Sequence, residues 1–103
     1  MAIQNTAVST GAAQSIYTSS GASAITTIHL ANYTGTAVTA NVYLVPSGSS
    51  AGNGTVIYSN YSITAYNTLI IYQEKFILSN GDAVYANCGT ANALTATVSS
   101  IGI

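Results

Sequence analysis

The groups that could carry acid–base chemistry gather in one segment near the C-terminal end, residues 74–82. It holds both carboxylates of the chain, Glu74 and Asp82, and the only lysine, Lys75. Paired carboxylates can hydrolyse a glycosidic bond when they flank it at a fixed separation. Here a predicted turn separates them, and Lys75 favours the ionised form of its neighbour Glu74. We therefore expect a structural role, in which the acids cap the turn and form a surface ion pair.

Neither His29 nor Cys88 has the neighbours that a catalytic or metal site requires. A zinc site usually needs two or more His or Cys ligands at close spacing, and nothing near His29 supplies them. Cys88, the only cysteine, lies in an alternating apolar segment, which is typical of a small buried side chain. With one histidine and no nucleophile-elbow motif, the serines give no sign of a catalytic triad. The sequence therefore predicts no catalytic residue, no metal and no cofactor. We expect His29 to be a strand residue on the outward face, where its one special role would be a pH-sensitive interface contact.

The eight tyrosines are the strongest candidates for contact residues. Tyrosine combines a large apolar area with a hydrogen-bonding tip, and it is enriched at interfaces and sugar-binding surfaces. Tyr43, Tyr72 and Tyr85 fall on the faces of their expected strands that are opposite the inward-facing residues. They are our predicted interface residues, although tyrosine also suits strands for reasons of packing alone.

Charge is almost absent from this chain. Charged residues make up 3% of it, against roughly 25% in an ordinary soluble domain. A net charge of −1 gives little repulsion between copies, which favours association of the protein with itself or with a partner. The alternative is a surface hydrated by uncharged hydroxyls and amides. A single lysine cannot neutralise a row of phosphates or an anionic lipid surface, so we expect neither a nucleic-acid partner nor a membrane partner.

The length and the ends of the sequence indicate one domain made in a reducing compartment. The 103 residues suffice for one domain, 1–103, with a modest core and no disulfide. Residues 1–6 have neither the basic nor the apolar region of a signal peptide, and the longest apolar run, 69–72, is too short for a membrane span. We therefore expect synthesis in a cytosol rather than secretion.

Alternating apolar and polar residues dominate the chain from end to end. The pattern predicts strands over 2–8, 13–17, 24–30, 38–45, 55–59, 61–64, 68–78, 83–88 and 93–101, where 55–64 reads as one strand with a bulge near Asn60. In 24–30 we expect Ala24, Thr26, Ile28 and Leu30 to face the core. We expect Asn32–Thr36 to form a hairpin-like connection and residues 47–54 to form a mobile loop.

Asn80, Gly81 and Asp82 form the strongest turn signal of the sequence. Asn-Gly between two apolar runs is typical of a tight hairpin, in which both central residues take positive φ angles. Phe76 and Leu78 before it should point to the core.

These patterns predict the fold class. No segment carries a sustained helical period, and short strands alternate with turns at intervals of about ten residues. The sequence therefore predicts an all-β protein, an antiparallel β-sandwich of seven or eight strands. Spacing leaves open whether its connectivity is immunoglobulin-like or jelly-roll.

Several stretches of the chain resemble small β-sandwich structural proteins of tailed bacteriophages, over nearly the full length. These are Ala2–Val8, Ile16–Thr18, Ala24–Ile28, Asn41–Pro46, Ile57–Ser59 and Leu78–Asp82. Proteins of that kind are found as capsid decoration (cement) proteins or as neck, fibre or tail components. The resemblance implies a non-enzymatic virion protein present in many copies, often as trimers. It also implies a partner such as the major capsid protein, and synthesis in the cytoplasm of a bacterial host.

We expect a capsid decoration protein that reinforces the shell by bridging its subunits, since many weak contacts stabilise a lattice through avidity. A neck, tail or fibre component remains open. So does a carbohydrate-binding adhesion module, which would use tyrosines such as Tyr58 and Tyr61 or the 47–54 loop. An enzyme would need catalytic groups from another chain.

Overall fold

The computed structural model describes residues 2–8, 13–72, 76–89 and 93–102, and these residues form strands and turns without a helix. The prediction of an all-β protein is confirmed. The nine strands are β1 (Ala2–Val8), β2 (Gln14–Thr18), β3 (Ser23–Asn32), β4 (Val38–Val45), β5 (Val56–Ile63), β6 (Thr68–Ile71), β7 (Phe76–Leu78), β8 (Ala83–Cys88) and β9 (Leu94–Gly102).

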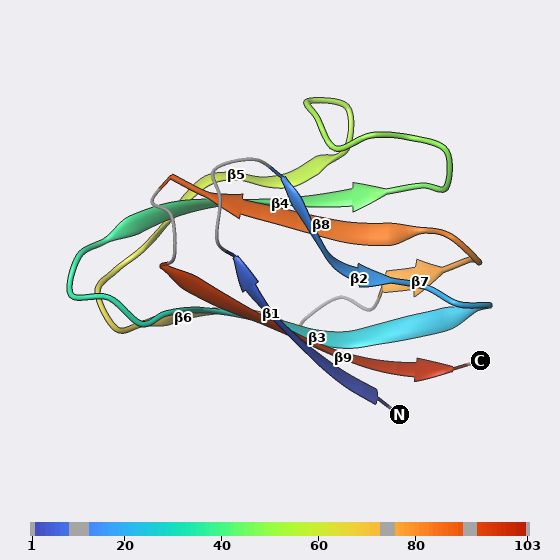
Figure 1. Ribbon diagram of the computed structural model, residues 1–103, viewed down its shortest axis with the longest axis horizontal. Coiled ribbons are helices and arrows are strands. Elements are labelled where there is room, and N and C mark those ends of the chain that lie inside the picture. The colour runs from blue at the N-terminus through green and yellow to red at the C-terminus, as the bar shows by residue number, and fades with distance from the viewer. Residues whose placement is uncertain (1, 9–12, 73–75, 90–92, 103) are drawn as a thin grey trace.

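The strands make two antiparallel sheets, which form two layers (Figure 1). One sheet has the order β1-β9-β3-β6, and β7 also pairs with β3. The other has the order β2-β8-β4-β5. Among the described strands, β4 and β5 are the only two that follow one another in the chain and pair directly. The chain therefore passes from one sheet to the other at nearly every connection.

One core of aliphatic side chains lies between the layers, and both sheets contribute to it. Its largest fully buried members are Ile16, Ile25, Ile28, Leu30 and Leu94. Small residues such as Ala40 and Ala86 fill other inward positions, and the aromatic rings of Tyr17, Tyr58 and Phe76 only pack against the margin of the core. Burial of this apolar area is the main force that holds the layers together, at about 25 cal/mol per Å².

The alternation of β8 and β9 agrees with the expected inward positions, whereas that of β3 does not. In β3, Ile25 is buried, and Ala24 and Thr26 are only partly so. The pairing of β3 with β9 shifts between Ile25 and Thr27, which is a β-bulge. The bulge changes the phase of the alternation, so the expectation that Ala24 and Thr26 face the core was wrong, and the expectation for Ile28 and Leu30 was right.

The strand count also differs from the prediction of seven or eight. The run 68–78 forms two strands, β6 and β7, which pair with successive parts of β3. The prediction for 55–64 is confirmed, because β5 is one strand with a shift in its pairing where Asn60 takes a φ of 52°.

Two predicted hairpins are not hairpins. Residues 32–36 join β3 to β4, and residues 79–82 join β7 to β8, and both links cross from one sheet to the other. In the second link only Gly81, with φ 88°, has a positive φ angle, so the expectation of a positive φ at Asn80 was wrong.

Candidate functional site

The two long sides of the layered structure are built differently, and the side formed by edge strands β1 and β2 is closed. The Gln4 side chain donates through Nε2 to the carbonyl oxygen of Ile16 at 3.0 Å. The Gln14 side chain donates in the opposite direction, to the carbonyl oxygen of Ala7 at 3.0 Å. These amides tie one sheet to the other, because each satisfies a backbone acceptor at an edge that lacks a strand partner there.

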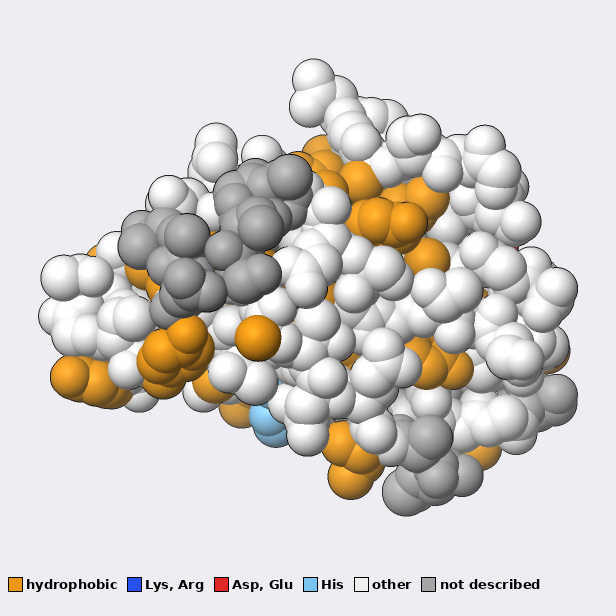
Figure 2. Space-filling model, viewed as in Figure 1, with side chains coloured by type: hydrophobic (Ala, Val, Ile, Leu, Met, Phe, Trp, Pro, Cys, Tyr) orange, Lys and Arg blue, Asp and Glu red, His pale blue; other side chains and the backbone are white. Residues whose placement is uncertain are grey.

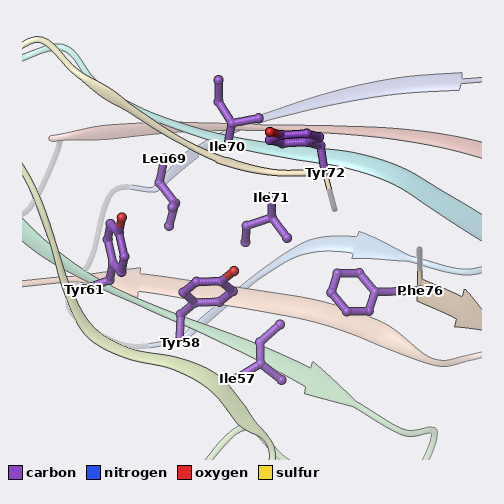
Figure 3. A pocket seen from close by; sticks show the side chains of 8 residues that line it. All are labelled: Ile57, Tyr58, Tyr61, Leu69, Ile70, Ile71, Tyr72 and Phe76. Atoms are coloured by element: carbon purple, nitrogen blue, oxygen red, sulfur yellow. The ribbon is translucent and has the colours of Figure 1, made fainter. Parts of the chain in front are cut away.

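The opposite side, between β5 and the edge formed by β6 and β7, is open. A groove of about 470 Å³ lies there, and it is the candidate site. We call it the apolar groove. Figure 3 shows its walls, in which Leu69 and Ile71 point toward the rings of Tyr58 and Tyr61. The lining residues are Ile57, Tyr58, Tyr61, Leu69, Ile70, Ile71, Tyr72 and Phe76.

The bulge in β5 places two rings on the same side of that strand. Tyr58 pairs with Val42 and Tyr61 with Ala40, and both partners are fully buried inward positions. A regular strand would send residues three apart to opposite faces. The extra residue at Asn60, whose backbone N–H donates to Oδ1 of Asn41 at 2.8 Å, removes that difference. The rings then meet edge to face, with centroids 5.8 Å apart and an interplanar angle of 75°.

The apolar groove exposes hydrophobic area to solvent. Tyr61 is 45% exposed, Ile70 47% and Tyr72 56%. The described residues that line it include no Asp, Glu, Lys, Arg or His. These residues suit the binding of apolar or aromatic groups, with tyrosine hydroxyls for hydrogen bonds.

The three predicted interface tyrosines lie in two separate places. Tyr72 lies in the apolar groove. Tyr43 and Tyr85 are cross-strand partners on β4 and β8, where both are half-buried. Beside them on the same two strands, Nδ2 of Asn41 donates to Oδ1 of Asn87 at 2.7 Å. The structure thus brings Tyr43 and Tyr85 together but separates them from Tyr72.

Sequence reasoning missed most of the groove. The sequence named Tyr58 and Tyr61 only as candidate sugar contacts, and it did not predict Ile57, Ile70 or Phe76 as contact residues. Phe76, which we expected to point to the core, packs against the core and also lines the groove. The available signal was the run 69–72, which is apolar at successive positions although an edge strand normally alternates. That signal gave no indication of the partner strand.

The predicted turn residues form several hydrogen bonds, within the turn and to other loops. Asp82 N donates to the Ser79 carbonyl oxygen at 3.1 Å and closes the turn. Its carboxylate accepts from the backbone N–H of Ser79 and of Ser47, both at 2.9 Å. Oδ1 of Asn80 accepts from the backbone N–H of Gly21 at 2.9 Å. The turn therefore anchors two other loops. Glu74 and Lys75, for which we expected an ion pair, lie outside the described residues.

The hydrogen bonds from Ser47 N–H, and then from Ser79 N–H, lower the pKa of Asp82 below its ordinary value of 3.8. A lowered pKa means that Asp82 stabilises the fold above the unfolded-state pKa and that this contribution is lost as the pH falls through the folded-state value.

We predict that Asp82→Asn makes the free energy of unfolding less dependent on pH in the acid range. The variant should be less stable than the wild type at about pH 7, and the difference should shrink as the pH is lowered toward about 2.5 and the wild-type carboxylate takes up its proton. Urea unfolding at both pH values measures it. A difference that is independent of pH would contradict the role of the ionised carboxylate.

His29 is the cross-strand partner of the groove-lining residue Ile70, whereas Cys88 is not among the residues that line the groove. His29 is exposed on the outer face of its sheet, between Ile70 of β6 and Thr97 of β9. Figure 2 shows the pale blue imidazole on a surface of uncharged polar groups and scattered apolar patches. Cys88 is buried. Within the described ranges, no three His, Cys, Asp or Glu side chains group together as metal ligands would.

None of the described residues forms a helix with the length and hydrophobicity of a membrane span. No protein-family model, curated protein or solved structure matches the chain.

Proposed function

We propose that this chain is a non-enzymatic structural protein of a bacteriophage virion, of the capsid decoration type, which acts in many copies. The observation that carries the proposal is the apolar groove, a partly solvent-exposed surface whose described lining residues carry no formal charge, in a chain of net charge −1. Exposed apolar grooves mark sites of protein contact, and contact between uncharged surfaces meets no charge repulsion. The same reasoning extends to a neck, tail or fibre component, which would use the groove against a different neighbour.

We further propose that the two layers form a β-sandwich with jelly-roll connectivity. If β6 and β7 count as one interrupted strand, eight strands lie in the orders β1-β9-β3-β6 and β2-β8-β4-β5. A jelly roll has eight strands in two sheets, and it occurs in viral capsid proteins and lectins. An immunoglobulin-like sandwich would pair several consecutive strands within a sheet, whereas only β4 and β5 do so among the described strands.

Self-association through the apolar groove is the testable core of this proposal. We expect the wild-type chain to form a defined oligomer, with trimers as the resemblance suggests, and Ile70→Thr to weaken that association about tenfold. Gel filtration with light scattering over a range of concentrations measures the mass. The matched control is Ile3→Thr, because Ile3 is 70% exposed on β1, at the opposite edge of the same sheet.

Two results would contradict this proposal. A wild-type chain that stays monomeric and soluble at high concentration would contradict self-association. Equal weakening by Ile3→Thr and Ile70→Thr would contradict the groove as the contact site.

A second candidate function, carbohydrate binding, is favoured by the way Tyr58, Tyr61, Tyr72 and Phe76 gather around one groove. Aromatic rings with hydroxyl tips suit the apolar faces and hydroxyls of a sugar. Binding of the chain to a glycan array that is lost in Tyr61→Ala, with the oligomeric state unchanged, would favour this function over assembly.

A further inference from the structure

The chain contains two Asn-Gly dipeptides, Asn53-Gly54 and Asn80-Gly81, and the structure places both at the centre of a β-turn. Thr55 N donates to the Gly52 carbonyl oxygen at 3.0 Å, so Asn53 and Gly54 are the two central residues of the first turn. Asp82 N closes the second turn in the same way, around Asn80 and Gly81. Both asparagines are exposed. By sequence, turn position and exposure the two dipeptides are alike.

Asn-Gly is a reactive dipeptide because glycine places no side chain near its backbone nitrogen. That nitrogen can attack Cγ of the asparagine, lose its proton and expel the side-chain amide as ammonia. The product is a five-membered succinimide. Water then opens the ring at either carbonyl group and leaves aspartate or isoaspartate, so one water is consumed and one ammonia is released. The reaction needs no enzyme, metal or oxidant.

The hydrogen bonds of the second turn restrain both groups that must meet in this attack. Oδ1 of Asn80 accepts from the backbone N–H of Gly21 at 2.9 Å, which fixes the position of the side chain. The attacking nitrogen, that of Gly81, donates its hydrogen to the Ser19 carbonyl oxygen at 2.9 Å. Cyclisation at Asn80 therefore requires that the Gly81 nitrogen leaves Ser19 and that the Asn80 side chain leaves the position that Gly21 fixes.

The first turn has no such restraint. Among the described residues, neither the Asn53 side chain nor the Gly54 backbone N–H has a hydrogen-bond partner. The bonds that hold this loop belong to Thr55, whose hydroxyl accepts from Gly52 N and donates to the carbonyl oxygens of Ser50 and Gly52. No atom lies within 4 Å of a Cβ built on Gly54, so no other part of the structure crowds this glycine.

We propose that Asn53 is a site of spontaneous modification, at which the chain deamidates through a succinimide, and that Asn80 is protected by residues 19–21. Conversion of one amide to a carboxylate changes the formal net charge from −1 to −2. The isoaspartate product also lengthens the backbone by one methylene in the 47–54 loop. Aged protein would thus carry a new charge and an altered loop, and the charge would lie in a stretch that had none.

The experiment is an incubation of the full chain at about 37 °C and mildly alkaline pH, followed by chymotryptic peptide mapping with mass spectrometry. Cleavage after Tyr43 and Tyr58 isolates Asn53, and cleavage after Leu78 and Tyr85 isolates Asn80. We expect conversion at Asn53 to be about tenfold faster than at Asn80, or more, since two hydrogen bonds protect the latter. In urea-unfolded protein the two rates should become similar.

Gly54→Ala is the matched variant, because the added methyl group meets no atom within 4 Å and should leave the fold intact. It should slow conversion at Asn53 and leave Asn80 unchanged. Equal rates at the two sites in the folded protein, or a faster rate at Asn80, would overturn the proposal. So would a folded wild-type chain in which Asn53 stays unmodified while it reacts in urea.

Discussion

Replacement of Asn32 by aspartate will destabilise the protein by about 3–5 kcal/mol at neutral pH, although the two side chains have nearly the same shape. Asn32 is only 2% exposed, and its amide nitrogen donates to the carbonyl oxygens of Thr36 at 2.8 Å, Ile63 at 3.1 Å and Thr64 at 3.2 Å. In the aspartate variant a carboxylate oxygen would face these three carbonyl oxygens. The lost donor and the added repulsion together approach the total stability of a small domain.

The pH dependence of this variant distinguishes charge repulsion from a general packing defect. Burial and the three carbonyl dipoles raise the pKa of a carboxyl group at position 32 above its unfolded-state value. A protonated carboxyl group can donate one hydrogen bond. The deficit relative to the wild type is therefore fully present above the raised pKa and shrinks as the pH falls through it. Urea unfolding at about pH 7.5 and about pH 4.5 measures the change.

Asn5→Asp is the control for added charge. Asn5 is exposed on β1, and its Oδ1 accepts from the Thr97 hydroxyl at 2.8 Å, a role that aspartate retains. This variant should change stability by less than about 1 kcal/mol. If Asn32→Asp also changed the free energy of unfolding by less than about 1 kcal/mol, the hydrogen bonds of Asn32 would not stabilise the fold as we expect.

The second large effect is expected from Gly81→Val, at about 3 kcal/mol or more. Gly81 has a φ of 88°, which a β-branched residue adopts only under strain. A Cβ at this position would also lie 2.8 Å from Oγ and 3.1 Å from Cβ of Ser47. Chemical denaturation measures the loss, which includes the anchoring of two loops by this turn.

Gly48 separates the two causes, because its φ is 85° but no atom lies within 4 Å of a built Cβ. Gly48→Val should therefore cost only the backbone strain, about 1–2 kcal/mol. In a chain that already carries Gly81→Ala, the change Ser47→Gly should recover part of the lost stability, since it removes the crowded side chain and keeps the N–H that bonds Asp82. Equal losses for Gly48→Val and Gly81→Val would contradict the contribution of Ser47.

The sequence predicted best those strands in which the alternation runs without interruption. Val84, Ala86 and Cys88 on β8 and Leu94, Ala96 and Val98 on β9 are all buried, as their period of two indicated. It failed in β3 at the bulge between Ile25 and Thr27, because a bulge depends on how one strand pairs with another. The residues of a single strand do not show which strand pairs with it, or in what register.

Asn32 shows the same limit for a polar residue. Asn32-Tyr33-Thr34 reads as part of a polar connection and as a glycosylation sequon. In the structure, Oδ1 of Asn32 accepts from both the backbone N–H and the hydroxyl of Thr34, while its amide bonds to the end of β5. The bond to Thr34 is local and typical of an Asx turn, but the bonds to β5 join residues that are far apart in the sequence.

By itself, then, the sequence determined the class of this protein. Period-two alternation, the absence of helical periodicity and the scarcity of charge follow from residue types, and they predict an all-β domain of low charge in which the titratable groups of residues 74–82 serve a turn. Only the tertiary structure determined which residues from distant parts of the sequence are neighbours in space. It set Tyr58 and Tyr61 opposite Leu69–Tyr72 to make the groove, and it restrained one Asn-Gly turn and left the other free. The physical reason is that these differences depend on hydrogen bonds and packing between distant segments, whose register and bulges are settled only when the two sheets come together.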